Sequence, residues 1–175
     1  MIDFVLKPRK LASAIAYMVQ QRPGLTKKQI CKLLFFADKG HLLLHGRTIT
    51  GDRYFALEQG PIPTHGLDAM NGKGEAGTLL SAYGKLRGWV FELEHAPDLK
   101  PLSESDLSVI DETLERLGHL PAWKLEELTH EEPAWKETAQ NGPIDFELFF
   151  SGHPEAELVK TILLEENRVL AVEAR

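Results

Sequence analysis

Cysteine is almost missing from this sequence, since Cys31 is the single one among 175 residues. A lone cysteine cannot form a disulfide within the chain, so a reducing compartment is expected. The sequence also lacks any run of the roughly 20 apolar residues that a membrane-spanning helix requires. The N-terminal segment MIDFVLKPRK lacks the features of a signal peptide. We therefore expect a cytoplasmic protein without a membrane partner.

The motifs of common enzyme classes are missing too. There is no G-x-S-x-G elbow and no phosphate-cradling loop. Residues 72–77, GKGEAG, fit G-x-G-x-x-G but follow the helical stretch LDAMN rather than a strand, so a mobile surface loop is the expectation. Cys31 precedes the apolar run KLLFF, which is typical of a core cysteine. The sequence predicts no enzyme, no catalytic residue, no cofactor and no bound metal.

Charge is uneven along the chain. Residues 1–60 hold ten Lys/Arg and four Asp/Glu, whereas residues 61–175 hold ten Lys/Arg and 22 Asp/Glu. The net charge of -6 disfavours a nucleic-acid ligand, because phosphates repel an acidic protein. The acidic remainder of the chain would suit a basic partner protein.

Apolar spacing and caps predict a mainly α (α+β) fold of one helical domain, residues 1–175, with a small antiparallel β-hairpin or sheet on the helices. Thr26 and Gln29 form a capping-box pattern at the start of a helix that ends near Gly46. Further expected elements are a helix at 8–21, a strand at 53–58, a fixed connector at 60–63, a helix capped by Thr64 through 70, a strand at 88–94, helices at 103–118 and 121–128, and a C-terminal helix at 154–175.

Two functional alternatives arise from local patterns. Asp38, His41 and His45 share one helix face, and a metal-dependent hydrolase would use Asp38 and His41 with His130. The segment HLLLH lacks the glutamate of zinc proteases, so hydrogen bonds to nearby backbone or to each other are favoured for Asp38 and His41. The N-terminal helix pair could instead form a helix-turn-helix of a DNA-binding regulator, but its second helix is apolar beyond the first turn.

Two separated blocks carry a family resemblance. KLLFFAD at 32–38 with ITGDRYFALEQGPIP at 49–63, followed by LSESD at 102–106 and LTHEEPAW at 128–135, resemble the Panacea domain of SocA-like, often phage-associated antitoxins. The landmarks lie within about residues 10–140. The resemblance implies a bacterial antitoxin that binds a cognate toxin protein directly, or delivers it to a cytosolic protease. It implies no catalytic activity, and it does not identify the toxin.

Most residues of these blocks are expected to be structural. Glycines and prolines would fix turns, Asp52 would accept from turn amides, Thr129 and Glu132 would form a second capping box, and His130 would tie the blocks together by a buried hydrogen bond. The expected structural set is Asp38, His41, Gly51, Asp52, Gly60, Pro61, Thr129, His130, Glu132 and Trp135. The expected partner contacts are Arg53, Tyr54, Gln59 and His65.

Overall fold

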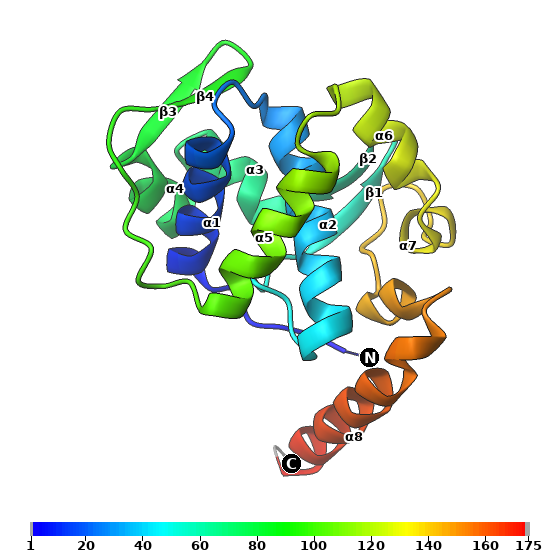
Figure 1. Ribbon diagram of the computed structural model, residues 1–175. Helices are drawn as coiled ribbons and strands as arrows, with labels where there is room; N and C mark the ends of the chain where they lie inside the picture. The colour runs from blue at the N-terminus through cyan, green and yellow to red at the C-terminus, as the bar shows by residue number, and fades with distance from the viewer. Residues whose placement is uncertain (1, 174–175) are drawn as a thin grey trace.

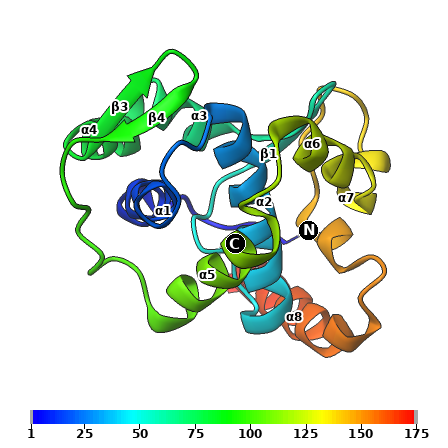
Figure 2. The same ribbon diagram turned by 45° about the horizontal axis from the view of Figure 1, so that its top comes forward.

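A long central helix, α2 (Lys27–His45), organises the fold of the computed structural model, which describes residues 2–173. Figures 1 and 2 show α1 on one side of α2, α6 and α7 on the other, and α5 across its front. The remaining helices are α1 (Pro8–Gln21), α3 (Thr64–Met70), α4 (Gly74–Ser81), α5 (Glu104–Leu117), α6 (Ala122–His130), α7 (Pro133–Lys136), η1 (Phe146–Phe150), η2 (Pro154–Ala156) and α8 (Glu157–Glu173). The mainly helical class is confirmed.

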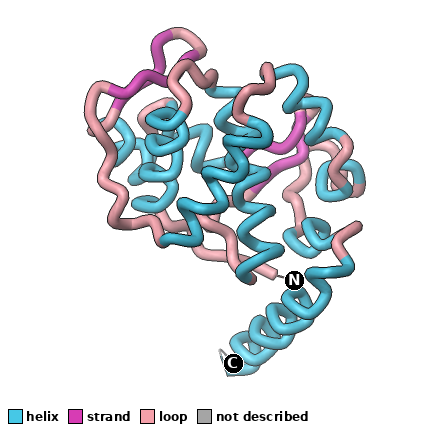
Figure 3. Tube along the Cα trace, viewed as in Figure 1, coloured by secondary structure: helices cyan, strands magenta, loops and turns pink. Residues whose placement is uncertain are grey.

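Two separate hairpins make up the β structure, as Figure 3 shows in magenta. β1 (Tyr54–Leu57) pairs antiparallel with β2 (Gly60–Pro63), and β3 (Gly84–Arg87) pairs antiparallel with β4 (Val90–Leu93). The expected strands at 53–58 and 88–94 therefore exist but do not pair with each other.

α2 is buried on most of its surface, which explains its apolar sequence. It begins at Thr26, whose side chain accepts from the amide of Gln29 in the predicted capping box, and it stops at Gly46 in the left-handed region with φ 71°. Its residues from Ile30 to Phe35 are all buried. They join one core cluster with α1 and α5 and, through Phe35, a second aromatic cluster around Tyr54 and Phe149.

Several local expectations are wrong. Residues 60–63 form strand β2 rather than a connector, because both strands of a two-stranded hairpin are edges, where proline is tolerated. Thr64 lies inside α3, whose N-cap is Pro63, and makes no cap. The expected mobile loop at 71–77 is half helix, since α4 begins at Gly74.

The second capping box is also absent. Thr129 lies within α6, and its hydroxyl donates to the carbonyl of Glu126 instead of capping the next helix. Glu132 is the N-cap of α7 by its backbone, with Pro133 at the first helical position. Within residues 2–173, no helix has both the length and the apolar content needed to cross a membrane.

Candidate partner-binding site and the polar network that shapes it

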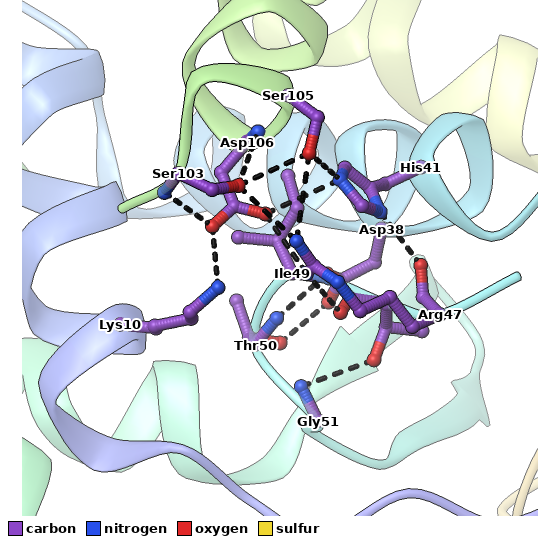
Figure 4. A network of polar contacts seen from close by, with 11 residues as sticks. Lys10, Asp38, His41, Arg47, Ile49, Thr50, Gly51, Ser103, Ser105 and Asp106 are labelled. Atoms are coloured by element: carbon purple, nitrogen blue, oxygen red, sulfur yellow. Dashed lines mark hydrogen bonds and ion pairs between the residues drawn. The ribbon is translucent and has the colours of Figure 1, made fainter. Parts of the chain in front are cut away.

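Asp38 organises the loop that leaves α2. Its Oδ1 accepts from the backbone amides of Ile49 (2.7 Å) and Thr50 (3.0 Å). Its Oδ2 accepts from the hydroxyls of Thr50 (2.5 Å) and Tyr54 (2.7 Å). The side chain is fully buried, and burial raises its pKa to about 6 although these hydrogen bonds act in the opposite direction. One carboxylate thus fixes the loop and the first residue of β1 to the central helix. Figure 4 shows its contacts with Ile49 and Thr50.

A second buried carboxylate, Asp106, joins α1 and the loop to α5. Lys10 Nζ lies 2.5 Å and Arg47 Nη1 2.9 Å from its oxygens, and the amide of Ser103 donates to it at 2.9 Å. The last contact belongs to the capping box of α5. Burial alone would raise the pKa of Asp106, but the contacts from Lys10, Ser103 and Arg47 lower it to about 2.

His41 lies in the same network, on the next turn of α2 after Asp38 (Figure 4). Its Nδ1 is 2.8 Å from the carbonyl of Arg47, so Nδ1 carries the proton and donates. Nε2 then accepts from the Ser105 hydroxyl at 3.0 Å. Burial is the largest influence on His41 and lowers its pKa to about 4, so the ring is neutral at pH 7. Asp38 and His41 each bond backbone groups, and neither bonds the other.

Asp38 and His41 make opposite contributions to the pH dependence of stability. The folded pKa of Asp38, about 6, exceeds its ordinary 3.8, so the unfolded chain loses this proton first and stability falls as pH rises between 4 and 6. The folded pKa of His41, about 4, is below its ordinary 6.5, so in the same interval the unfolded chain holds more protons and stability rises. The two contributions offset each other.

We expect the substitutions H41N and D38N to separate these contributions. Relative to the unsubstituted chain, H41N loses about 3 kcal/mol of unfolding free energy between pH 4 and 6, and D38N gains a similar amount. Urea unfolding at pH 4, 5 and 6 measures the three slopes. Because exposed carboxylates titrate equally in all three proteins, equal slopes of unfolding free energy against pH would contradict the contributions assigned to Asp38 and His41.

The residues expected to contact a partner lie around the β1–β2 hairpin but differ in exposure. Arg53, Gln59 and His65 are exposed. The expectation of an exposed Tyr54 is wrong, because its ring is 1% exposed inside the aromatic cluster and its hydroxyl binds Asp38.

Asp52 accepts turn and helix amides, in agreement with the role expected for it. Its carboxylate accepts from the amides of Arg53 (2.8 Å), His65 (3.1 Å) and Gly66 (2.7 Å), and from the His65 ring at 2.9 Å. The hairpin exit and the start of α3 are therefore fixed to one buried side chain, with the His65 ring projecting from it.

The two sequence blocks are joined by a hydrogen bond, but its donor is not the expected one. Trp135 Nε1 donates to the carbonyl of Leu57 at 2.8 Å. His130 stacks on Trp135 with ring centroids 4.1 Å apart, and its buried Nε2 has no hydrogen-bond partner among residues 2–173. The expected His130 hydrogen bond between the blocks is thus replaced by the indole of Trp135.

Gly60 marks the closest approach between the blocks. A Cβ at this position would lie 2.6 Å from Thr129 Oγ1 and 2.9 Å from Lys32 Nζ. Lys32 is fully buried, donates to the carbonyl of Pro61 at 3.0 Å, and has a pKa lowered to about 8 chiefly by burial. The sequence signal for a buried Lys32 is its position at the start of the apolar run KLLFF.

Among the described residues, the side chains considered for catalysis or metal binding do not come together in one site. Burial raises the pKa of the Cys31 thiol to about 12, which leaves it protonated. Within residues 2–173, no three His, Cys, Asp or Glu side chains lie close enough to hold a metal ion. Asp38 and His41 are engaged in the network, and His130 lies against Trp135 instead of joining them.

The helix-turn-helix geometry also fails at α2. A recognition helix must present a free side to a major groove. α2 is covered along most of its length, and the β3–β4 hairpin crosses its start, where the amide of Lys27 donates to the carbonyl of Trp89 at 2.7 Å. α2 therefore acts as the core of the fold.

A shallow groove of about 350 Å³ lies between α2 and α5. Apolar side chains form its floor, and the Lys39–Glu132 ion pair lies at its edge. Its lining includes Phe36, Leu43, Leu44, Val109, Leu117 and, just before α8, His153, Glu155 and Ala156. This groove is wide enough for side chains of a partner protein.

Comparison with protein-family models gives one match, to the antitoxin SocA-like, Panacea domain, over residues 30–136. The matched region runs from the first buried turn of α2 to the end of α7 and includes Asp38, Asp52, Asp106 and Trp135. No curated protein and no solved structure matches the chain. α1 and α8 lie outside the matched region.

Proposed function

The chain belongs to the SocA-like antitoxin family with a Panacea domain, and from this premise we propose that it neutralises a cognate toxin by binding it directly in the cytoplasm. The matched region spans more than half of the chain and includes both sequence blocks. The toxin is a protein encoded beside this chain's own gene, and neutralisation consists of covering its active surface.

This proposal rests on one observation, which is that the ionisable side chains of the family's sequence blocks are engaged in hydrogen bonds and ion pairs. Asp38 and Asp52 accept four hydrogen bonds each, and Asp106 is surrounded by Lys10, Arg47 and the cap of α5. Groups committed in this way hold loops in place, which supports a structural role for them rather than a catalytic one. A rigid scaffold with shaped loops is what a binding module requires.

Within this proposal the β1–β2 hairpin contributes contacts. Arg53 directly precedes β1 and pairs with Asp3, and His65 lies two residues after β2. Both are exposed, and Gln59 lies at the hairpin turn. Arginine is enriched at protein interfaces, where its planar group binds carboxylates. Tyr54 supports this face from beneath instead of contacting the partner.

The test is co-expression with the product of the adjacent reading frame. We expect that product to stop growth alone, and this chain to restore growth and co-purify with it at one-to-one stoichiometry. The variant D38A, which disrupts the scaffold, should fail to restore growth. A toxic neighbour whose effect persists in the presence of the folded, soluble chain would overturn the proposal.

The half-life of the toxin in the cell distinguishes covering of its active surface from its delivery to a protease. Covering predicts that the toxin's half-life is unchanged or longer when this chain is present. A half-life shortened in normal cells, and restored in cells without their cytosolic ATP-dependent proteases, would replace covering by proteolytic delivery. The same co-expression strains serve both measurements.

A further inference from the structure

α8 is the least covered helix of the molecule. In Figure 1 it projects from the base of the fold, away from the other helices. Its inner side packs where α2 ends, with Val159 and Leu163 against Gly46. Its outer side carries large apolar residues in solvent: Leu158 is 71%, Ile162 48%, Val169 55% and Val172 69% exposed.

These exposed residues form one stripe along the helix. Leu158, Ile162, Glu165, Val169 and Val172 follow one another at spacings of four, three, four and three residues. This is the a/d spacing by which one helix packs against another. All five side chains are exposed, and Glu165 at the centre is the only charged one. We call this set the α8 stripe.

Glu165 argues against a second copy of the chain as the occupant. Two copies paired in parallel bring Glu165 against Glu165. Two copies paired antiparallel bring it against the apolar Ile162 or Val169, so in neither pairing does the stripe supply a cation to Glu165. Like charges at the centre of a helix pair destabilise it. Glu165 has no ion-pair partner among residues 2–173, so no cation of the chain itself compensates it.

The apolar area that the stripe exposes gives a second argument about its occupant. The exposed apolar side chains of the stripe offer roughly 400 Å², about half of what one partner of a standard interface buries. The occupant must therefore contact the body as well. The groove between α2 and α5 ends at His153, Glu155 and Ala156, directly before α8 begins at Glu157. The groove is therefore the neighbouring part of the body that the occupant would reach first.

We propose that the α8 stripe is the docking surface for an apolar helix of the partner toxin, which presents a Lys or Arg to Glu165. This inference rests on the proposed function and names the surface that performs it. The helix as a whole favours a basic partner, because its four Glu outnumber Lys160 and Arg168. The stripe lies outside the region that the family model matches.

The test measures binding of the purified product of the adjacent reading frame to full-length variants. I162S/V169S should weaken binding at least 100-fold, because both apolar contacts at the a-type positions are lost. E165K should weaken it at least tenfold at low salt, and the difference from the unsubstituted chain should shrink at high salt. The matched control W123S removes an apolar side chain that is 63% exposed on α6 and should change affinity less than twofold.

Circular dichroism and thermal midpoints should be unchanged in all variants, because the substituted side chains are exposed. If the unsubstituted chain binds the product and I162S/V169S binds equally well, the stripe is not the docking surface. If the unsubstituted chain is a dimer that I162S/V169S converts to a monomer, the stripe serves self-association and the inference is overturned. Failure of the unsubstituted chain to bind would contradict the proposed function itself.

Discussion

The substitution D38A is expected to cost about 4 kcal/mol of unfolding free energy at pH 7. It leaves two amides and two hydroxyls without their acceptor in a buried place, and each such loss costs about 1–3 kcal/mol. The loss is partly offset because a buried ionised carboxylate no longer has to be desolvated. Against a total of about 5–15 kcal/mol this is a large fraction. Urea unfolding followed by circular dichroism measures it.

The matched variant D38N tests the reason for this loss. Asparagine keeps one acceptor oxygen in the same shape, so we expect about half the cost of D38A at pH 7. The near-ultraviolet signal of Tyr54 should change in both variants, since its hydroxyl loses a charged acceptor. A D38A protein that unfolds at the same urea concentration as the unsubstituted chain would show that the loop after α2 is held by something else.

The substitution G51A is expected to cost at least about 3 kcal/mol. Gly51 has φ 70°, where a residue with a Cβ pays roughly 1–2 kcal/mol. In addition, its Cβ would lie 2.0 Å from the carbonyl oxygen of Val5, an atom of the backbone. The N-terminal segment would have to move, which breaks the bond from the amide of Lys7 to the carbonyl of Thr50 at 2.8 Å. Thermal unfolding and hydrogen exchange at Lys7 measure both effects.

Gly24 provides the control for this position. Its φ is 90°, but a Cβ there would meet no atom within 4 Å. G24A therefore carries the backbone cost alone and should lose about 1–2 kcal/mol. Equal losses for G24A and G51A would mean that the contact with Val5 gives way without cost.

The sequence was most informative where a local interaction decides the structure. The capping box at Thr26 and the glycine stop at Gly46 are each made by residues within a few positions, and both exist. Local patterns failed where a second local signal competes with the first. Thr129 shows this, because Pro133 moves the next helix start to Glu132 and leaves Thr129 inside α6.

At Pro61 and Pro63 the error was the opposite one, because a connector was predicted where a strand exists. Pro61 and Pro63 exclude a central strand, but they are two residues apart, so both ring nitrogens face the same side of β2, away from β1. Whether a strand is an edge depends on the sheet that forms around it. The partner contact predicted for Tyr54 was wrong for a related reason. The burial of Tyr54 depends on Phe35 and Phe149, which lie far away along the chain.

Much of the polar network could not be foreseen. Lys10, Arg47 and Asp106 meet across 96 residues of chain, and none of them stands in a pattern that marks such a meeting. Asp38 was predicted to bond nearby backbone because its helix is apolar, and it does so with Ile49 and Thr50. The exposed stripe on α8 is visible as a spacing, but only the structure shows that no other element among residues 2–173 covers it.

The Asp38 contacts have a consequence for the order in which the chain folds. They join residues only 11, 12 and 16 positions apart, whereas Asp106 and Lys10 are 96 apart and Tyr17 and Asp111 are 94 apart. Closing a short loop costs less entropy and is faster than closing a long one. α2 with its following loop and hairpin can therefore form as an early unit during synthesis, before α5 leaves the ribosome. α1 has to wait for residues near 106–111 before its polar contacts are complete.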